Sequence, residues 1–172
     1  MAHWIRRLLV CVVACLPALS GAQSQAGWTP SDQQKLNVTL ATQQYFSFVE
    51  RGDFASAYAM LSKDMQRAIS LERWSIQRAD FNARVGEVLE RHISNITWGL
   101  APAVTPQGGV LAAVNHQAKF RNADIHCGKL FWQQQNDGSF KLMRELENSI
   151  DRKTQSQMTA EQLTAARQKI GC

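Results

Sequence analysis

The stretch VLAAVNHQAKF, Val110 to Phe120, decides the fold. Every second residue from Val110 onward is apolar except His116, and the residues between them become more polar toward Arg121. Alternation with a period of two is typical of an antiparallel strand that is buried on one face only. The stretch therefore predicts a sheet whose apolar face needs a cover, with one histidine pointing toward that cover.

Three further strands are predicted around this one. Val88 to Leu100 alternates less cleanly, which indicates a bulge partway along the strand. The other two predicted strands are Ile125 to Gln135 and Phe140 to Leu146. They flank Asn136-Asp137-Gly138, and an Asp-Gly pair between two such runs is typical of a hairpin. By simple alternation, the last strand has Arg144 on the same face as Phe140, Leu142 and Leu146.

Helices are predicted both before and after the sheet. Ser31, Asp53 and Ser70 each precede residues with apolar spacing typical of a helix, and all three are good N-cap residues. Thr159, with Gln162 three residues later, predicts a capping box at the start of a last helix. We therefore expect an α+β fold in which N-terminal helices pack on a curved antiparallel sheet of about four strands, with an added C-terminal helix.

The first 22 residues are predicted to be a secretory signal sequence. Arg6 and Arg7 precede an apolar run from Leu8 to Leu19, and Ser20-Gly21-Ala22 supplies the small residues of a cleavage site. The apolar run is too short for a membrane span of about 20 residues, so no transmembrane segment is expected. The chain is therefore predicted to be exported to the periplasm. A lipoprotein anchored through Cys15 remains the alternative, because Val12-Val13-Ala14-Cys15 resembles a lipobox.

The chain after the signal sequence divides into three parts. Residues 23–30 are polar and are predicted to be a flexible tether, residues 31–150 a single α+β domain, and residues 151–172 a linker and C-terminal helix ending in Cys172. Without Arg6 and Arg7, 17 basic residues remain against 14 acidic ones. This small surplus, with no basic stripe, argues against a nucleic-acid partner.

Export would place Cys127 and Cys172 where disulfides form and persist. A bridge between them would hold the C-terminal helix against the sheet and stabilise the fold by roughly 3–4 kcal/mol. A buried free Cys127 with an unbonded Cys172, or an intermolecular bridge, remain as alternatives.

Several motifs resemble those of one family. They are FSFVERGDFASAY at residues 46–58, Trp74 near a helix start, VGEVLER at residues 85–91 and the hairpin QNDGSF at residues 135–140. Together they resemble the family of domain of unknown function 4019, small secreted bacterial domains, over roughly Leu40 to Ile150. The resemblance implies a cone-shaped fold like that of nuclear transport factor two, and no established activity. This chain departs from the family pattern at Leu142-Met143-Arg144, where the family has an aromatic-rich strand, and in its C-terminal helix.

A candidate pocket follows from this arrangement. His116 would point into the cone from its strand, and Tyr58, Trp74 and Arg144 would lie near it, with Asp124 as a nearby acid. A buried histidine paired with an acid can act as a general base. The alternative is a core histidine that is hydrogen-bonded to a neighbour and has no catalytic role. His92 and His126 are expected at the surface or at an edge.

No other motif predicts chemistry. His116, Asp124, His126 and Cys127 could converge across a hairpin, but their spacing matches no metal motif, so neither a metal nor another cofactor is expected. The chain has no glycine-rich phosphate loop after a strand and no nucleophile elbow.

Two functions remain. The first is a non-catalytic binding or interaction domain that uses the concave sheet or its cavity for a protein partner or a small ligand. The second is a small-molecule enzyme with His116 as general base. A homodimer formed through the sheet is a further hypothesis.

Overall fold

The computed structural model describes residues 27–101 and 109–172. The predicted signal sequence, Cys15 and residues 23–26 of the predicted tether lie outside the described residues. Among the helices that are described, none is both long enough and apolar enough to cross a membrane.

The elements follow the predicted order of helices, antiparallel strands and C-terminal helix, which confirms the α+β class. The helices before the sheet are α1 (Asp32–Glu50), α2 (Phe54–Ala59), α3 (Lys63–Ala68) and α4 (Leu71–Val85). The strands are β1 (Val88–Leu100), β2 (Val110–Phe120), β3 (Ile125–Gln134) and β4 (Phe140–Ile150), and α5 (Arg152–Ser156) and α6 (Ala160–Ile170) follow. Two short helices, α3 and α5, are additions to the expected set, and α5 occupies residues predicted to be a linker.

Side-chain caps begin the helices where the sequence predicts them. The hydroxyl of Ser31 accepts a hydrogen bond from the Gln34 N–H, and the Gln34 side chain accepts one from the Ser31 N–H, which completes a capping box. Asp53 and Ser70 cap α2 and α4 through their side-chain oxygens alone, which accept from the N–H groups of Ser56 and Arg73. Gly86 ends α4 with φ of 76°, a conformation that residues with a Cβ rarely adopt.

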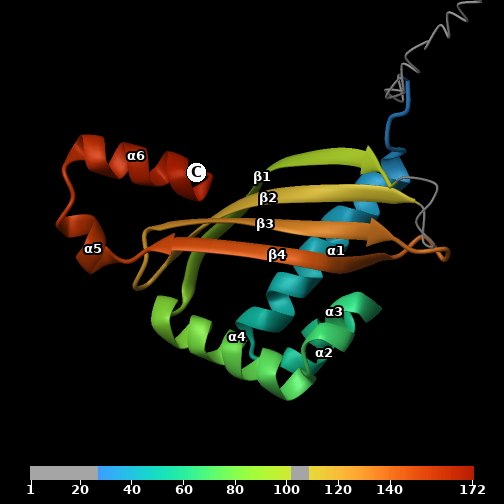
Figure 1. Ribbon diagram of the computed structural model, residues 1–172, viewed down its shortest axis with the longest axis horizontal. Helices are drawn as coiled ribbons and strands as arrows, with labels where there is room; N and C mark the ends of the chain where they lie inside the picture. The colour runs from blue at the N-terminus through green and yellow to red at the C-terminus, as the bar shows by residue number, and fades with distance from the viewer. Residues whose placement is uncertain (1–26, 102–108) are drawn as a thin grey trace, which may run out of the picture.

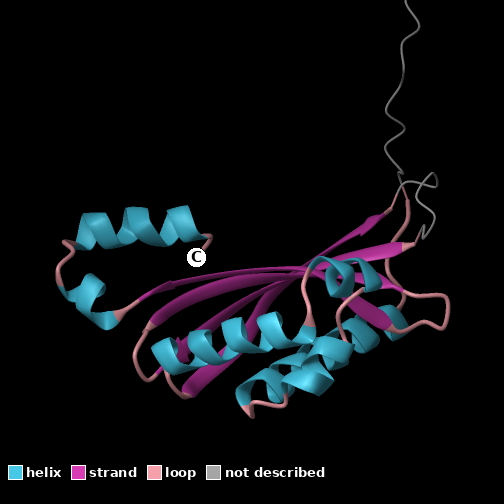
Figure 2. Ribbon diagram, turned by 60° about the horizontal axis from the view of Figure 1, so that its bottom comes forward, coloured by secondary structure: helices cyan, strands magenta, loops and turns pink. Residues whose placement is uncertain are grey.

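The sheet is antiparallel with the strand order β1-β2-β3-β4. Its strands curve, and helices α1 to α4 cover one face, whereas α6 lies beyond the opposite face (Figures 1 and 2). Strand β2 alternates buried and more exposed residues along nearly its whole length, as its sequence predicts. Tyr45 of α1 packs edge-on against Trp132 of β3, and both rings are fully buried in the main core.

Bulges in both edge strands change which residues face the helices. The expected bulge in β1 is present, with irregularities between Val88 and Glu90 and between Ile93 and Asn95. A second bulge, which the sequence did not predict, lies in β4, where Phe131 pairs with Arg144 but the next residue, Trp132, pairs with Leu142. One extra residue reverses the facing of every residue that follows it.

The bulge in β4 corrects the predicted face of this strand. Leu142 lies on the helix side, as expected, but Arg144 and Leu146 are exposed, and Glu145 and Glu147 turn toward the helices in their place. Strand β4 also continues to Ile150, four residues beyond the predicted end.

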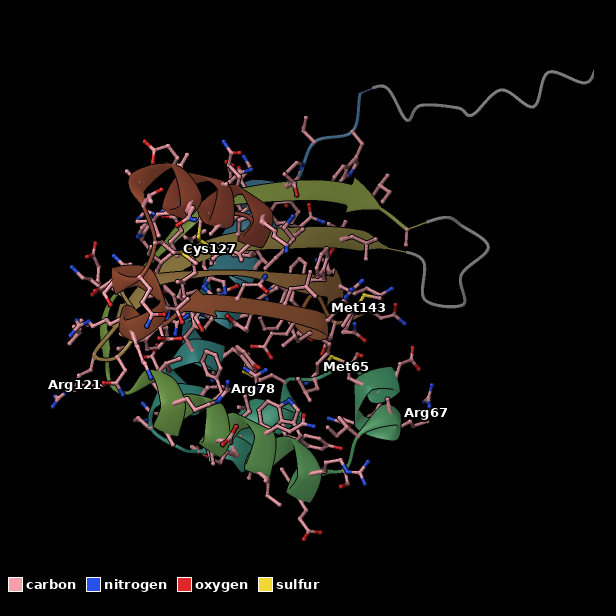
Figure 3. The ribbon with its side chains drawn as sticks, turned by 60° about the vertical axis from the view of Figure 1, so that its left-hand side comes forward. Met65, Arg67, Arg78, Arg121, Cys127 and Met143 are labelled. Carbon is pink, nitrogen blue, oxygen red and sulfur yellow. A yellow bond between two sulfur atoms is a disulfide. The ribbon has the colours of Figure 1, made fainter. Side chains whose placement is uncertain are left out.

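A disulfide joins Cys127 of β3 to Cys172, as predicted, within one chain. Figure 3 shows Cys127 beneath the C-terminal helix, on the sheet face opposite α4. No residue of α6 is buried, so the bridge and a bond from the Asn148 amide to the Ile170 carbonyl hold the helix beside the sheet.

Candidate functional site

A cavity of about 370 Å³ lies between the sheet and helices α1 and α4. Its lining comes from five elements and the α4–β1 turn: Tyr45, Phe46, Val49, Glu50, Arg78, Phe81, Asn82, Ala83, Gly86, Glu87, Val88, Arg91, Phe120, Glu145 and Glu147. Aromatic and aliphatic side chains form much of the wall, and the charged residues of β4 lie at its inner end.

Arg78 and Glu145 form an ion pair at that inner end. The Nη2 of Arg78 lies 2.7 Å from Oε2 of Glu145, and Nη1 donates to Oε1 at 2.9 Å. The Tyr45 hydroxyl donates to the same carboxylate at 2.9 Å. Figure 3 shows Arg78 extending from α4 toward the sheet. Three donors from two helices therefore hold Glu145 in one orientation.

Arg91 forms the opposite wall of the cavity. Its Nε donates to Glu50 of α1 at 2.9 Å, and its guanidinium lies 4.0 Å from the centre of the Phe46 ring. Its Nη1 lies 3.2 Å from Nδ1 of His116. A guanidinium can only donate, so Nδ1 accepts this bond and the proton of a neutral His116 is on Nε2.

Below the cavity, His116, His126 and Glu147 lie together on the helix side of the sheet. The Nε2 of His116 lies 3.5 Å from Oε1 of Glu147, and the Nε2 of His126 lies 2.5 Å from Oε2. Both histidines are 1% exposed. His116 was expected to point inward and does so, whereas His126 was expected at the surface or an edge and is buried. His92 is not buried, which agrees with its predicted place at the surface or an edge.

The surroundings of these groups shift their pKa values in different directions. Burial lowers the pKa of His116, against the opposing effect of Glu147, and favours the neutral ring. Burial alone would raise the pKa of Glu147, but the adjacent rings of the two histidines hold that pKa well below its usual range. Burial and the nearby Glu147 raise the pKa of Glu145, while the Arg78 guanidinium opposes the shift and favours the charged carboxylate with which it pairs.

The structure places the other predicted pocket residues outside this site. The Tyr58 hydroxyl donates to the Ile69 carbonyl at 2.8 Å, with the Gln66 carbonyl 3.1 Å away, and Trp74 packs against Tyr58 within the helical layer. Arg144 is exposed, 6.0 Å from the Phe131 ring. Asp124 pairs with Arg152 at 3.0 Å. Of the named set, His116 reaches the cluster below the cavity, and Tyr58, Trp74 and Arg144 do not join it.

The residues that build the site were mostly missed by the sequence analysis. They are Tyr45, Arg78, Arg91, His126, Glu145 and Glu147. Glu145 and Glu147 did carry a signal in the sequence. Residues two apart in a strand point to the same face, so these two acids are expected on one side of β4. Simple alternation within the predicted strand would turn Glu145 away from the face of Leu142, and Glu147 lay beyond the predicted end at Leu146. The bulge turns both acids toward the helices.

Comparison with known proteins identifies the family to which this chain belongs. The family described as "Protein of unknown function (DUF4019)" matches residues 41–145, more than half of the chain. No curated protein matches the chain.

Two solved structures from Streptomyces are similar in part. Aln2 from a Streptomyces species is 9% identical, with a TM-score of 0.46, over 71% of this chain and 94% of that one. A candidate dehydratase of the NTF2-like family from Streptomyces avermitilis is 12% identical, with a TM-score of 0.43, over 67% and 94%.

Proposed function

This chain belongs to the DUF4019 family, whose description names no activity, and from its own residues we propose that it is a non-catalytic domain that binds a small organic ligand in the cavity between α1, α4 and the sheet. The observation that carries the proposal is the cavity itself. Its volume of about 370 Å³ falls within the range typical of small-molecule sites, roughly 300–1,000 Å³.

The lining supports a compact ligand with an apolar body and one polar end. Phe46, Phe81 and Phe120 contribute flat apolar walls. At the inner end, Arg78, Glu145 and Tyr45 already bond to one another, so their orientation is set before a ligand arrives. Groups held in this way lose little conformational entropy on binding, which favours affinity.

The alternative is a small-molecule enzyme with His116 as general base, and the hydrogen bonds of His116 argue against it. A general base needs a free lone pair within reach of the substrate. Nδ1 of His116 accepts from Arg91, Nε2 faces Glu147, and the ring does not line the cavity. The binding function is therefore preferred.

Two alanine-to-tryptophan variants of α4 test the binding proposal. Ala83 lines the cavity, whereas Ala79, one helical turn earlier, is exposed and does not line it. We expect some compounds in a metabolite panel to raise the melting temperature of the wild-type protein and of Ala79→Trp, and to have a reduced effect on Ala83→Trp. Compounds that stabilise all three proteins equally would contradict binding in this cavity.

Turnover of the same compounds separates the two functions. Binding without turnover supports the binding domain. Turnover that is lost in His116→Ala would instead support the enzyme.

We also propose that the protein is exported to the periplasm. The signal-like pattern of residues 1–22 supports this, as does the disulfide, since such bonds persist in oxidising compartments. Cell fractionation followed by N-terminal sequencing tests the proposal. A mature protein that begins at Gln23 is expected, and a lipidated Cys15 would establish the anchored alternative.

A homodimer formed through the outer face of the sheet stays a prediction. Leu89, Met143 and Leu146 are exposed by 55%, 40% and 37%, and Leu146 lies on that face of β4. Light scattering is the measurement. A dimer mass that falls to the monomer mass in Leu146→Lys would support it, and a monomer mass for the wild-type protein would contradict it.

A further inference from the structure

Three side chains of the kinds that bind transition metals meet on the inner face of the sheet. Their ligand atoms, one ring nitrogen each from His116 and His126 and a carboxylate oxygen of Glu147, all lie within 4.8 Å of one another. Ligands that share one Zn²⁺ at roughly 2.0–2.2 Å stand roughly 3–4 Å apart. The 3.5 Å between Nε2 of His116 and Oε1 of Glu147 has this spacing, and the 2.5 Å between Nε2 of His126 and Oε2 of Glu147 must widen to reach it.

Strand register places the three residues together. His116 of β2 pairs with Gly128 of β3, and Gly128 pairs with Glu147 of β4, so His116 and Glu147 lie on either side of Gly128 on one face. His126 lies two residues before Gly128 and shares that face. Both histidines are 1% exposed, and the rings of Phe81 and Phe120 pack against His126.

The polar atoms of this cluster lack the hydrogen bonds that usually accompany burial. Nε2 of both histidines and Oε2 of Glu147 have no hydrogen bond of acceptable geometry within the described residues, even though the 2.5 Å separation of His126 and Glu147 is short. An unsatisfied buried polar group costs roughly 1–3 kcal/mol, so three such groups within 4.8 Å of one another call for an explanation.

Gly128 allows two of these ligand atoms to approach the backbone of β3 closely. A Cβ on Gly128 would overlap Nε2 of His116 and would lie 2.6 Å from Oε2 of Glu147, so both ligand atoms stand directly above the bare backbone of β3. A larger residue at this position would fill the space between them.

We propose that His116, His126 and Glu147 form a binding site for a divalent transition metal, with Zn²⁺ as the best-fitting ion. Two imidazoles and one carboxylate are a known Zn²⁺ ligand set, and imidazole selects against Mg²⁺ and Ca²⁺, which prefer oxygen. Three protein ligands leave a fourth position, and Glu147 also lines the cavity. The proposal goes beyond ligand binding in the cavity and does not depend on it.

Arg91 opposes the metal in this arrangement. Its donation to Nδ1 of His116 keeps the ring proton on Nε2, the atom that must bind the ion. Metal binding therefore requires that proton to move to Nδ1 or to leave, and the Arg91 contact to break. Metal-bound histidines usually donate their other N–H to an acceptor, and such partners change metal affinity by roughly 10–100-fold. Glutamine at position 91 would offer that acceptor.

Calorimetric titration with Zn²⁺ of the disulfide-bonded full chain, after treatment with a chelator, tests the site. We expect one binding event that is weakened at least tenfold in both His126→Gln and Glu147→Gln. His92, which lies outside the cluster, provides the matched control, and His92→Gln is expected to bind as the wild type does. Arg91→Gln is expected to bind at least tenfold more tightly.

Folding is checked separately, because the ligands are buried. Circular dichroism of each variant shows whether it is folded, and the Zn²⁺-induced rise in melting temperature of the wild-type protein gives a second readout that needs no variant. Absence of binding and of a thermal shift in the wild type would overturn the proposal. Equal binding by folded His126→Gln, or weaker binding by Arg91→Gln, would overturn it as well. A wild-type protein that binds Zn²⁺ but no panel compound would leave this site standing and count against the cavity.

Discussion

Arg78 of α4 and Glu145 of β4 join the helical layer to the sheet through two charge-assisted contacts, 2.7 Å and 2.9 Å long. Their side chains are 17% and 5% exposed. Because solvent screens a pair this buried only weakly, each partner depends on the other for its stabilisation.

Glu145→Ala is expected to lower the free energy of unfolding by about 3–5 kcal/mol, because it leaves Arg78 charged and unpaired in a buried position. Urea denaturation measures the loss. The control is Glu87→Ala, which breaks an exposed pair with Arg121 and is expected to cost less than about 1 kcal/mol. Similar losses in the two variants would show that burial does not strengthen the Arg78–Glu145 pair.

Gly128→Ala is expected to destabilise the fold by about 1–3 kcal/mol or more, because its Cβ would overlap His116 and Glu147. Gly99→Ala in β1 is the matched control, since a Cβ there meets nothing within 4 Å. Thermal unfolding compares the two. If Gly128→Ala unfolds at the temperature of Gly99→Ala, the close packing over Gly128 is wrong.

Reduction of the Cys127–Cys172 bond is expected to release α6 and leave the sheet folded. The helix has no buried residue, so little else holds it in place. Hydrogen exchange should show lost protection at residues 160–170 and retained protection in β2 and β3. The whole chain should also lose roughly 3–4 kcal/mol of stability. Unchanged protection of α6 after reduction would mean that other contacts hold the helix.

Asp53 is expected to make part of the stability depend on acid pH. Hydrogen bonds from Ser56 lower the pKa of this N-cap carboxyl from the usual 3.8. The unfolded chain therefore binds the proton first, so the contribution is complete above pH 3.8 and is lost as pH falls through the lowered value. Asp53→Asn keeps an N-cap acceptor and should flatten this part of the curve of stability against pH. A curve as steep as that of the wild type below about pH 4 would exclude this role for Asp53.

Local features of the sequence predicted the elements and their order. The alternation of β2, the Asp-Gly turn before β4 and the caps at Ser31, Asp53 and Ser70 act over a few residues, and each appears where the sequence places it. The short helices α3 and α5, of 6 and 5 residues, were missed, because neither buries a residue and so neither shows the apolar spacing that marked α2.

From the sequence, the candidate site was predicted at His116, and His126 was named only in a set of residues that could converge with it and that matched no metal motif. His126 was expected at the surface or an edge. It lies between Ile125 and Cys127 in a strand that is largely covered on both faces, so alternation of polar and apolar residues does not show which face is buried. Arg78 and Tyr45 lie on helices, and their partners are 67 and 100 residues away along the chain. Such pairings depend on how the layers pack and have no local signal.

By itself, then, the sequence determined the α+β class and the strand that carries His116, and it predicted the Cys127–Cys172 bridge while leaving two alternatives open. The tertiary structure alone decided that Glu145 and Glu147 face the helices while Arg144 faces solvent. The reason is the extra residue in β4 opposite Phe131 and Trp132. A bulge exists only when a strand is paired with its neighbour, and from that point it turns every side chain to the other face.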